Sequence, residues 1–384
     1  MEKWQEISNL DQYDTPLFVV YEDRIKQNIE KAIALLSGNV SRFRPHIKTH
    51  KMGEILGLFS HYGIDKVKCA TIAEAELAAL NGMRDVMIAY QPVGFKIHRM
   101  MNLISAFPNC TFSCLVDNLE NARAIADVAK GKANAEENHQ GPAFKKLQEI
   151  KVYLDLNTGM NRTGFPITEN VVQFVAALKA VDGLKFMGLH IYDGHIHDPD
   201  PAVRAARAKP AMDKVLDDAD ELIRQGFQDL SIIAGGSNTF TYYSGIERLE
   251  CSPGTFVFWD ENYTRLLPEL DFKNAAVLVC SVISLPAPGL ICVDLGYKSV
   301  SSENPIDKRV VFPWNLDLSP IGHSEEHLTL KHIGPREYKV GDRIYGLPYH
   351  VCPSCALYEE AQVVNDHQIE KSWRIKARDK KISI

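Results

Sequence analysis

The feature that most constrains this sequence is an alternation of short apolar runs with amphipathic stretches, which continues from residue 17 to about residue 236. The stretch DRIKQNIEKAIALL, after the first run, places apolar residues at helical spacing. Eight runs predict strands, most of them followed by a helix: 17–20, 42–48, 66–72, 85–90, 111–117, 151–157, 184–194 and 230–236. Eight such units predict an α/β fold, the (β/α)8 TIM barrel. An open doubly wound sheet is the competing layout, because periodicity alone does not show closure.

After about residue 255 the pattern changes to strand-like segments that are separated by Pro/Gly turns and lack long helices. We therefore expect the barrel over residues 16–255 and a smaller, C-terminal all-β domain over 256–384, which roughly the first 15 residues join. Residues 130–149 are polar and interrupt the alternation, so we expect a surface insertion there.

Charge and composition exclude several classes of protein. The net charge is −6, and no run of basic residues marks a nucleic-acid surface. No stretch of about 18 apolar residues could span a membrane, and the first ten residues lack the apolar core of a secretory signal. Eight irregularly spaced cysteines suit a reducing compartment, so we expect a cytoplasmic protein. One CxxC without a second does not favour a structural zinc ribbon.

Polar residues gather where the predicted barrel strands end. Lys48 closes the second run, residues 157–162 follow the sixth, Tyr192 and His195 close the seventh, and residues 235–239 follow the eighth. The bodies of these strands read as uninterrupted apolar runs just upstream. Because barrel enzymes build their sites at the C-terminal ends of the strands, this pattern predicts one site.

The segment RPHIKTHK packs several cations into a few residues. A lysine at the end of a barrel strand is desolvated and crowded by other cations, which favours the neutral amine that a Schiff-base nucleophile requires. Lys48 and His50 lie two residues apart, so on an extended backbone their side chains point the same way. A solvated basic loop is the alternative interpretation.

The segment AGGSNTF offers the backbone amides of Gly235 and Gly236 and the hydroxyls of Ser237 and Thr239. Amides and hydroxyls of this kind bind phosphate, and barrels often carry a phosphate site at this position. An ordinary Gly-Ser turn is the alternative.

Arg162 stands among small residues in LDLNTGMNRTGF. Its guanidinium could pair with a phenolate or carboxylate of a ligand. A simple ion pair with Asp155 explains the same pattern equally well.

In the predicted β-domain, PYHVCPSC places His350 and Cys352 two residues apart, hence on one face of a strand. One imidazole and one thiolate suit Zn²⁺ best, and two protein ligands leave positions open for water or substrate. A pair of core residues is the alternative, and Cys355 is either a third ligand or a buried thiol.

Taken in order, these motifs resemble the D-serine dehydratase/D-threonine aldolase family. They are RPHIKTHK, GMNRTG, YDGH, the Gly-Gly-Ser turn, PGTFVFWD and HVC, and they extend over nearly the whole chain. Members of this family are fold-type III pyridoxal-phosphate enzymes related to alanine racemase.

The resemblance implies pyridoxal 5′-phosphate as the cofactor, a D-3-hydroxy amino acid as the substrate, and a role for each matching residue. Lys48 would carry the cofactor, Arg162 would lie near its 3′-oxygen and Tyr192 near its ring. Phosphate contacts would come from Gly235, Gly236 and Ser237, and metal ligands from His350 and Cys352. The resemblance also implies a homodimer with sites at the interface.

The His-Val-Cys pair is similar to the zinc-dependent dehydratase branch, whereas the aldolases have an aspartate that suits Mn²⁺ or Mg²⁺. We therefore expect a zinc-dependent lyase that eliminates water from a D-serine-like substrate to give a 2-oxo acid and ammonia. The alternative is retro-aldol cleavage to glycine and an aldehyde, with His195 or His50 as the base. A racemase, for which Tyr297 would be the second base, and a non-catalytic pyridoxal-phosphate carrier are further alternatives.

Overall fold

The computed structural model describes residues 3–131 and 149–384, so most of the insertion expected at 130–149 lies outside the described residues. The chain divides into two compact units. We call residues 33–48, 56–254 and 379–384 the barrel unit, and residues 1–32, 49–55 and 255–378 the sheet unit. No helix in the described part of the chain is both long and apolar enough to cross a membrane. The functional domains expected at 16–255 and 256–384 stay a prediction.

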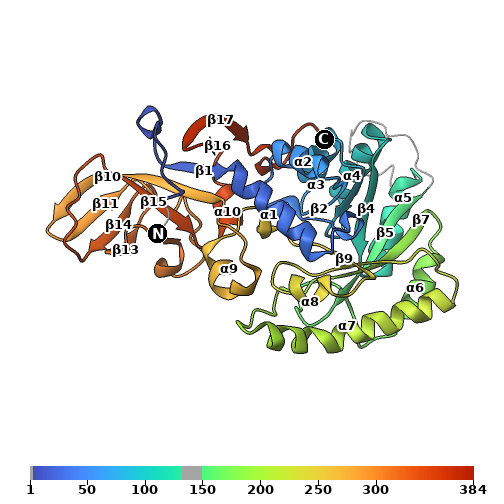
Figure 1. Ribbon diagram of the computed structural model, residues 1–384. Helices are drawn as coiled ribbons and strands as arrows, with labels where there is room; N and C mark the ends of the chain where they lie inside the picture. Colours follow the sequence, from blue (N-terminus) through green and yellow to red (C-terminus); the bar gives the residue numbers. More distant parts are fainter. Residues whose placement is uncertain (1–2, 132–148) are drawn as a thin grey trace. The chain divides into compact units, whose positions relative to one another are not determined.

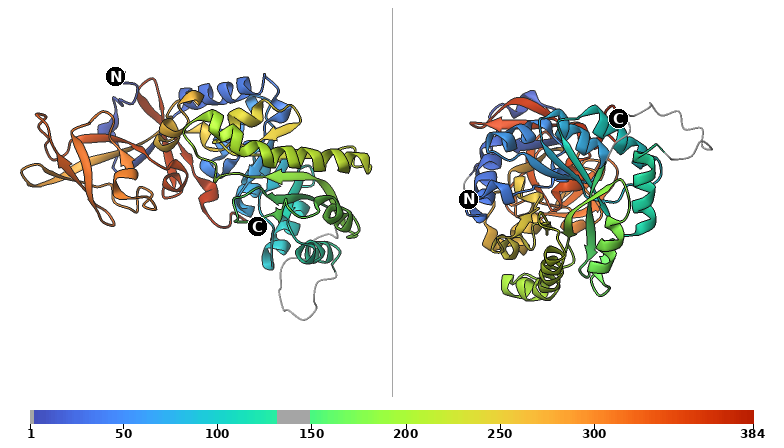
Figure 2. Two further views of the ribbon diagram at one scale, coloured as in Figure 1. Left: turned by 90° about the horizontal axis from the view of Figure 1, so that it is seen from below. Right: turned by 90° about the vertical axis from the view of Figure 1, so that its right-hand side faces the viewer.

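The barrel unit is built on a parallel sheet with the strand order β2-β3-β4-β5-β7-β8-β9 (Figure 1). Its strands are β2 (Lys66–Cys69), β3 (Asp85–Ile88), β4 (Thr111–Val116), β5 (Ile150–Asn157), β7 (Leu184–Ile191), β8 (Ser231–Ala234) and β9 (Leu249–Cys251), with the short β6 (Phe165–Pro166) beside β5. Helices surround this sheet (Figure 2, right). They are α3 (Ile72–Leu80), α4 (Phe95–Ala106), α5 (Leu119–Ala129), α6 (Val171–Lys179), α7 (Pro201–Arg224) and α8 (Phe240–Ser244).

The segment 43–46 closes this sheet into a barrel. Phe43 forms a parallel bridge with Cys251 of β9, and His46 forms one with Lys68 of β2. Adding this segment to the seven ordered strands gives the predicted eight. The (β/α)8 prediction is therefore confirmed, whereas the open sheet is wrong.

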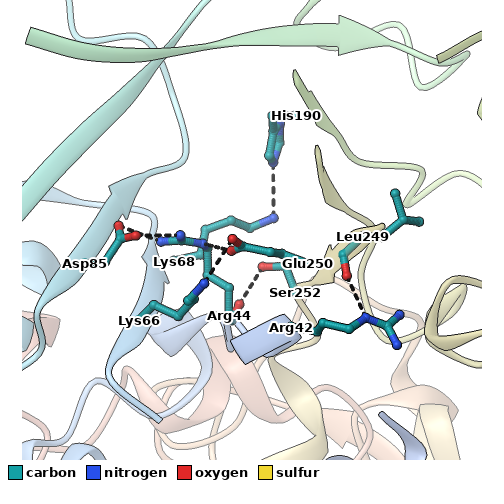
Figure 3. Close-up of polar contacts among 9 residues, drawn as sticks. All are labelled: Arg42, Arg44, Lys66, Lys68, Asp85, His190, Leu249, Glu250 and Ser252. Atoms are coloured by element: carbon teal, nitrogen blue, oxygen red, sulfur yellow. Dashed lines mark hydrogen bonds and ion pairs between the residues drawn. The ribbon is translucent and has the colours of Figure 1, made fainter. Parts of the chain in front are cut away.

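Arg44, at 1% exposure, fastens the closing segment to its neighbours. Its guanidinium donates two hydrogen bonds to Asp85 of β3, both 2.8 Å long, and one of 2.7 Å to Glu250 of β9 (Figure 3). Lys66 also contacts Glu250, at 3.0 Å. These ion pairs link four barrel segments, namely the closing segment, β2, β3 and β9.

A glycine allows two neighbouring barrel strands to approach closely. Gly188 of β7 has φ = +152°, and a Cβ atom there would lie 1.9 Å from the carbonyl oxygen of Ser231 on β8. The pairing of β5 with β7 shifts register at this level, between Val152 and Tyr153. Any side chain at residue 188 would therefore force β7 and β8 apart.

The sheet unit contains a mixed sheet ordered β13-β14-β11-β10-β1-β16-β17, in which β15 pairs with β10 and β12. Its strands are β1 (Leu17–Tyr21), β10 (Ala276–Ala287), β11 (Leu290–Val293), β12 (Val310–Val311), β13 (Leu318–His323), β14 (Leu328–His332), β15 (Arg343–Pro348), β16 (Glu360–Asn365) and β17 (Gln368–Arg374). It also holds α9 (Glu261–Leu266) and α10 (Val351–Cys355). Helices α1 (Glu22–Leu35) and α2 (Gly53–His61) each cross a unit boundary.

The strand predicted at residues 17–20 is present as β1, but it belongs to this second sheet, so its assignment to the barrel was wrong. Strand β1 pairs antiparallel with β10 and parallel with β16. The buried side chains of Val19 and Tyr21 join a core with Val277 and Val279. A run of buried apolar residues fits either sheet, and the eighth barrel strand is instead β9, which the sequence analysis missed.

Candidate active site

Two predicted site residues, Lys48 and Arg162, lie near the ring of Tyr192, which follows β7 directly. A small pocket beside it is lined in part by Asp155, Arg162 and His190. The Arg162 guanidinium carbon lies 5.2 Å from the centre of the Tyr192 ring, close enough for a cation–π contact. Asp155 is hydrogen bonded to His190, so the structure does not support the alternative in which Arg162 and Asp155 simply pair.

Lys48 reaches the same ring from the turn that follows the closing segment. Its amine nitrogen lies 5.8 Å from the ring centre of Tyr192. Residues Ile47–Thr49 form a 3-10 turn, so the expected extended backbone from Lys48 to His50 was wrong. Lys48 thus belongs to the group of predicted site residues at the barrel mouth.

His50 lies in the sheet unit and is completely buried. Its Nδ1 atom accepts a hydrogen bond of 3.1 Å from the backbone N–H of Met52. Burial, and then the charge of Lys51, lower the pKa of His50 to about 3. The imidazole is therefore neutral at physiological pH, which is the protonation state that a general base requires.

The turn after β8 holds the glycines predicted to bind phosphate. Gly235 has φ = +73°, and a Cβ atom there would lie 2.6 Å from the Tyr243 ring. A Cβ atom on Gly236 would lie 2.9 Å from the Tyr192 ring. Ser237 is buried beside them, with 4% of its surface exposed. These glycines let the backbone pass close to both rings.

Thr239 has a structural partner that the sequence analysis did not anticipate. Its hydroxyl donates a 3.0 Å hydrogen bond to Asp193, which also accepts one from the hydroxyl of Tyr243. Burial raises the pKa of Asp193, although these hydrogen bonds partly offset the effect. The Thr239 side chain therefore helps to shape the turn.

Three polar side chains, Lys68, His190 and Asp155, contact one another inside the barrel. They were not predicted, because the strand bodies were interpreted as apolar. The amine of Lys68 on β2 lies 3.2 Å from Nε2 of His190 on β7 (Figure 3). Nδ1 of His190 lies 2.7 Å from a carboxylate oxygen of Asp155 on β5. The sequence does contain a sign of these contacts, since Lys68 and His190 interrupt otherwise apolar strands.

The barrel mouth fits a polar, anionic cofactor. Among residues 3–131 and 149–384, the Nδ1 atom of His195 is buried without a hydrogen-bond partner. The loop after β5 lies close to this ring, because a Cβ atom on Gly159 would be 3.1 Å from Nε2 of His195. Buried polar atoms normally find partners, so a ligand atom would complete this site. The cationic side chains of Lys48 and Arg162 beside Tyr192 complement the negative charge of a phosphorylated pyridine, and the glycine turn supplies backbone N–H groups.

The sheet unit brings His350 and Cys352 together at the start of α10. His350 is the N-cap residue of this helix, so the expectation that the pair lies on a strand was wrong. Burial opposes protonation of His350, but the hydrogen bond and charge of Cys352 outweigh it and raise the pKa of the imidazole to about 9. The imidazole of His350 and the sulfur of Cys352 are thus in direct contact, as two ligands of one metal ion would be.

Neighbouring side chains orient this pair. A carboxylate oxygen of Glu303 lies 2.6 Å from Nδ1 of His350, which leaves Nε2 for a metal ion. The hydroxyl of Thr49 lies 3.2 Å from the sulfur of Cys352. Cys355 is buried and its thiol donates to the carbonyl oxygen of His50. No group of three or more His, Cys, Asp or Glu within the described ranges could hold a metal, so water or substrate would complete the coordination.

Comparison with known proteins extends over both units. The sequence model of the alanine racemase N-terminal domain matches residues 20–261, and that of a serine dehydratase domain matches residues 275–364. The 3-hydroxy-D-aspartate aldolase of Paracoccus denitrificans (strain Pd 1222) is 27% identical over 382 residues, covering 95% of this chain and 92% of the relative.

Solved structures agree with this match. The D-threonine aldolase of Filomicrobium marinum has a TM-score of 0.80 at 26% identity, covering 95% of each chain. D-threo-3-hydroxyaspartate dehydratase, in the metal-free form of a variant with one cysteine replaced by alanine, has a TM-score of 0.79 at 20% identity and covers 95% of this chain and 98% of the other. A further variant of that dehydratase has a histidine replaced by alanine two positions before the cysteine. The chain belongs to the alanine racemase N-terminal domain family, and within it to the D-serine dehydratase/D-threonine aldolase group of fold-type III pyridoxal-phosphate enzymes.

Proposed function

We propose that this chain is a pyridoxal-phosphate- and zinc-dependent lyase that eliminates water from a D-3-hydroxy amino acid. The observation that carries the proposal is the contact between His350 and Cys352, with Glu303 bound to Nδ1 of the imidazole. The same two residue types, at the same spacing, were replaced in the solved dehydratase, and one of those structures is in the metal-free form. A thiolate ligand favours Zn²⁺ over Mn²⁺ or Mg²⁺.

The residues at the barrel mouth would hold the cofactor. In this proposal Lys48 would be the point of covalent attachment, Arg162 would lie near the 3′-oxygen and Tyr192 near the ring. The backbone N–H groups of Gly235 and Gly236, with the hydroxyl of Ser237, bind the phosphate. When bound, pyridoxal phosphate accepts the electron pair released at the substrate Cα.

The reaction then requires a base at Cα and an acid at the β-hydroxyl. The amine of Lys48 would be the base that takes the Cα proton. Zn²⁺ on His350 and Cys352 would supply Lewis acidity at the β-oxygen.

Retro-aldol cleavage is the second candidate, favoured by the 27% identity to an aldolase. It requires a base at the β-hydroxyl instead. His195, with its buried and unsatisfied Nδ1 atom, suits that role, and the buried neutral imidazole of His50 is the other candidate. The same residues would thus serve either reaction, and the orientation of the bound substrate would decide which of its bonds breaks.

One assay separates these reactions. The purified protein, loaded with pyridoxal phosphate and Zn²⁺, is incubated with D-serine, D-threonine and D-3-hydroxyaspartate, and the products are identified. A 2-oxo acid with ammonia supports dehydration, whereas glycine with an aldehyde supports the aldolase. An L-amino acid as product would support a racemase, with Tyr297 as the second base. Yellow protein that is inert towards all three would indicate a carrier.

The metal and the homodimer are tested separately. Chelation should abolish turnover, and adding Zn²⁺ back should restore it. Full activity of the dialysed, metal-free protein would refute the role of His350 and Cys352. Sedimentation of the holoenzyme measures whether it is the homodimer that we propose.

A further inference from the structure

Three cationic side chains surround the ring of Tyr192 in the barrel unit. The amine of Lys68 lies 5.9 Å from the ring centre, the amine of Lys48 lies 5.8 Å from it, and the guanidinium carbon of Arg162 lies 5.2 Å from it. Lys48 and Arg162 have roles in the proposed function, whereas Lys68 has none. Lys68 projects from the middle of β2 and is only 3% exposed, so its amine is largely shielded from solvent.

Hydrogen bonds link Lys68, His190 and Asp155 in a chain, and the donor and acceptor of each bond can be assigned. Burial raises the pKa of Asp155, but the hydrogen bond and charge of His190 outweigh this effect and lower it, so Asp155 is a carboxylate. Burial, and then the charge of Lys68, lower the pKa of His190, so its ring is neutral. The Nδ1–H of His190 therefore donates to Asp155, and its Nε2 accepts from the amine of Lys68.

Charged groups on several barrel segments act on this amine. Burial, the largest effect, lowers the pKa of Lys68 to about 7, and Lys48 and Arg44 act in the same direction. Asp155 and Asp193 oppose them. Lys68 therefore exchanges its proton near neutral pH, and an anion placed beside Tyr192 would favour the charged form.

We propose that Lys68 is the buried countercharge for the anionic cofactor and takes up a proton from solvent when that cofactor binds. This inference rests on the proposed function, because it assigns to Lys68 a role in binding the phosphorylated pyridine beside Lys48. The chain through His190 to Asp155 is what keeps the amine aimed at this site in both charge states. A neutral Lys68 limits cationic repulsion in the empty site, and a charged one strengthens the filled site.

The test measures proton uptake rather than turnover. Pyridoxine 5′-phosphate lacks the aldehyde and forms no bond with Lys48, so it is the probe. Its binding is followed by titration calorimetry at pH 6 and pH 8, in buffers of different ionisation enthalpy, for the wild type and for Lys68→Met, Lys68→Arg and Lys66→Met. Lys66 lies on the same strand but pairs with Glu250, which makes its variant the matched control.

At pH 8 the wild type and Lys66→Met should take up more protons than Lys68→Met, by up to about one per site, because Lys68 is largely neutral before binding. At pH 6 this difference should vanish. Lys68→Met should bind the probe roughly tenfold more weakly at pH 6, as expected for the loss of a cation near an anion in a partly screened interior. Lys68→Arg, which stays charged, should keep the affinity and lose the extra uptake at pH 8.

Equal proton uptake by the wild type and Lys68→Met at pH 8 would overturn the inference and leave the proposed function intact. Should Lys68→Met fail to fold, Lys68→Arg decides, because wild-type proton uptake by that variant is equally incompatible with the inference. Pyridoxal phosphate is added to the wild type in parallel. If the wild type binds neither this cofactor nor the probe, the proposed function fails, and the inference with it.

Discussion

Replacing Arg44 with methionine should destabilise the barrel, because this side chain ties the closing segment to β3 and β9. The substitution keeps an unbranched apolar side chain in place but removes three charged hydrogen bonds, two to Asp85 and one to Glu250. Both carboxylates then lose a partner, although Lys66 still contacts Glu250. The expected result is a less stable barrel with an unchanged fold.

The magnitude follows from the burial of the partners. Breaking a buried ion pair costs about 3 to 5 kcal/mol, because it leaves an uncompensated charge. The side chain of Arg44 is 1% exposed, but that of Asp85 is 34% exposed and its charge can be solvated. We therefore expect about 3 kcal/mol, the lower end of that range. For a unit of this size this corresponds to a fall in Tm of roughly 6 to 12 °C.

The pH dependence gives a second signature. Burial opposes ionisation of Asp85, but Arg44 outweighs it and holds the pKa of this carboxyl below its usual value of 3.8. Asp85 thus contributes stability that is present above pH 3.8 and is lost as the pH falls through its folded-state pKa. The difference in stability between the wild type and Arg44→Met should therefore shrink in acid.

Urea denaturation and calorimetry on the holoenzyme measure both effects. Lys66→Met is the control, since it removes a less buried partner that makes one contact with the same Glu250, and it should cost less than Arg44→Met. If Arg44→Met loses no more stability than this control, or if the loss does not depend on pH, the ion pairs do not hold the barrel closed.

Three further outcomes are expected. Gly194→Ala, whose Cβ atom would lie 2.6 Å from Tyr192, should displace that ring and lower the affinity for pyridoxal phosphate, measured by fluorescence titration; unchanged affinity would contradict it. Glu303→Gln should weaken Zn²⁺ binding roughly 10- to 100-fold in a chelator competition, because it supports His350, and wild-type affinity would show that it does not. Burial raises the pKa of Asp260 from 3.8 to about 6, so its contribution to stability is full below pH 3.8 and declines as the pH rises through 6. Asp260→Asn should remove this decline in denaturation curves, and a decline that persists would implicate another group.

Much of the architecture was predictable because its signals are local. The alternation of apolar runs and amphipathic stretches predicted the barrel, and the Pro/Gly-separated strands after residue 255 predicted a second sheet. The order of short motifs indicated the family, which the sequence comparison confirmed. Lys48, Arg162 and Tyr192 were selected by their place in the chain, and the structure brings their side chains together.

The errors concern features that local pattern does not encode. A run such as residues 17–20 is equally apolar in either sheet, and only strand pairing assigns it to β10 and β16. His350 and Cys352 are two residues apart whether they lie on a strand or at the start of a helix, and only the structure shows that α10 begins directly after His350.

The amino-acid sequence alone determined the kind of secondary structure, the family and the residue types available for chemistry, because periodicity and short motifs are properties of neighbouring residues. Only the tertiary structure decided that Lys68, His190 and Asp155 form one chain, since 122 positions separate Lys68 from His190. Their contact depends on strand order and on closure of the barrel. Burial in that closed barrel, in turn, brings the pKa of the Lys68 amine to about 7, close to physiological pH.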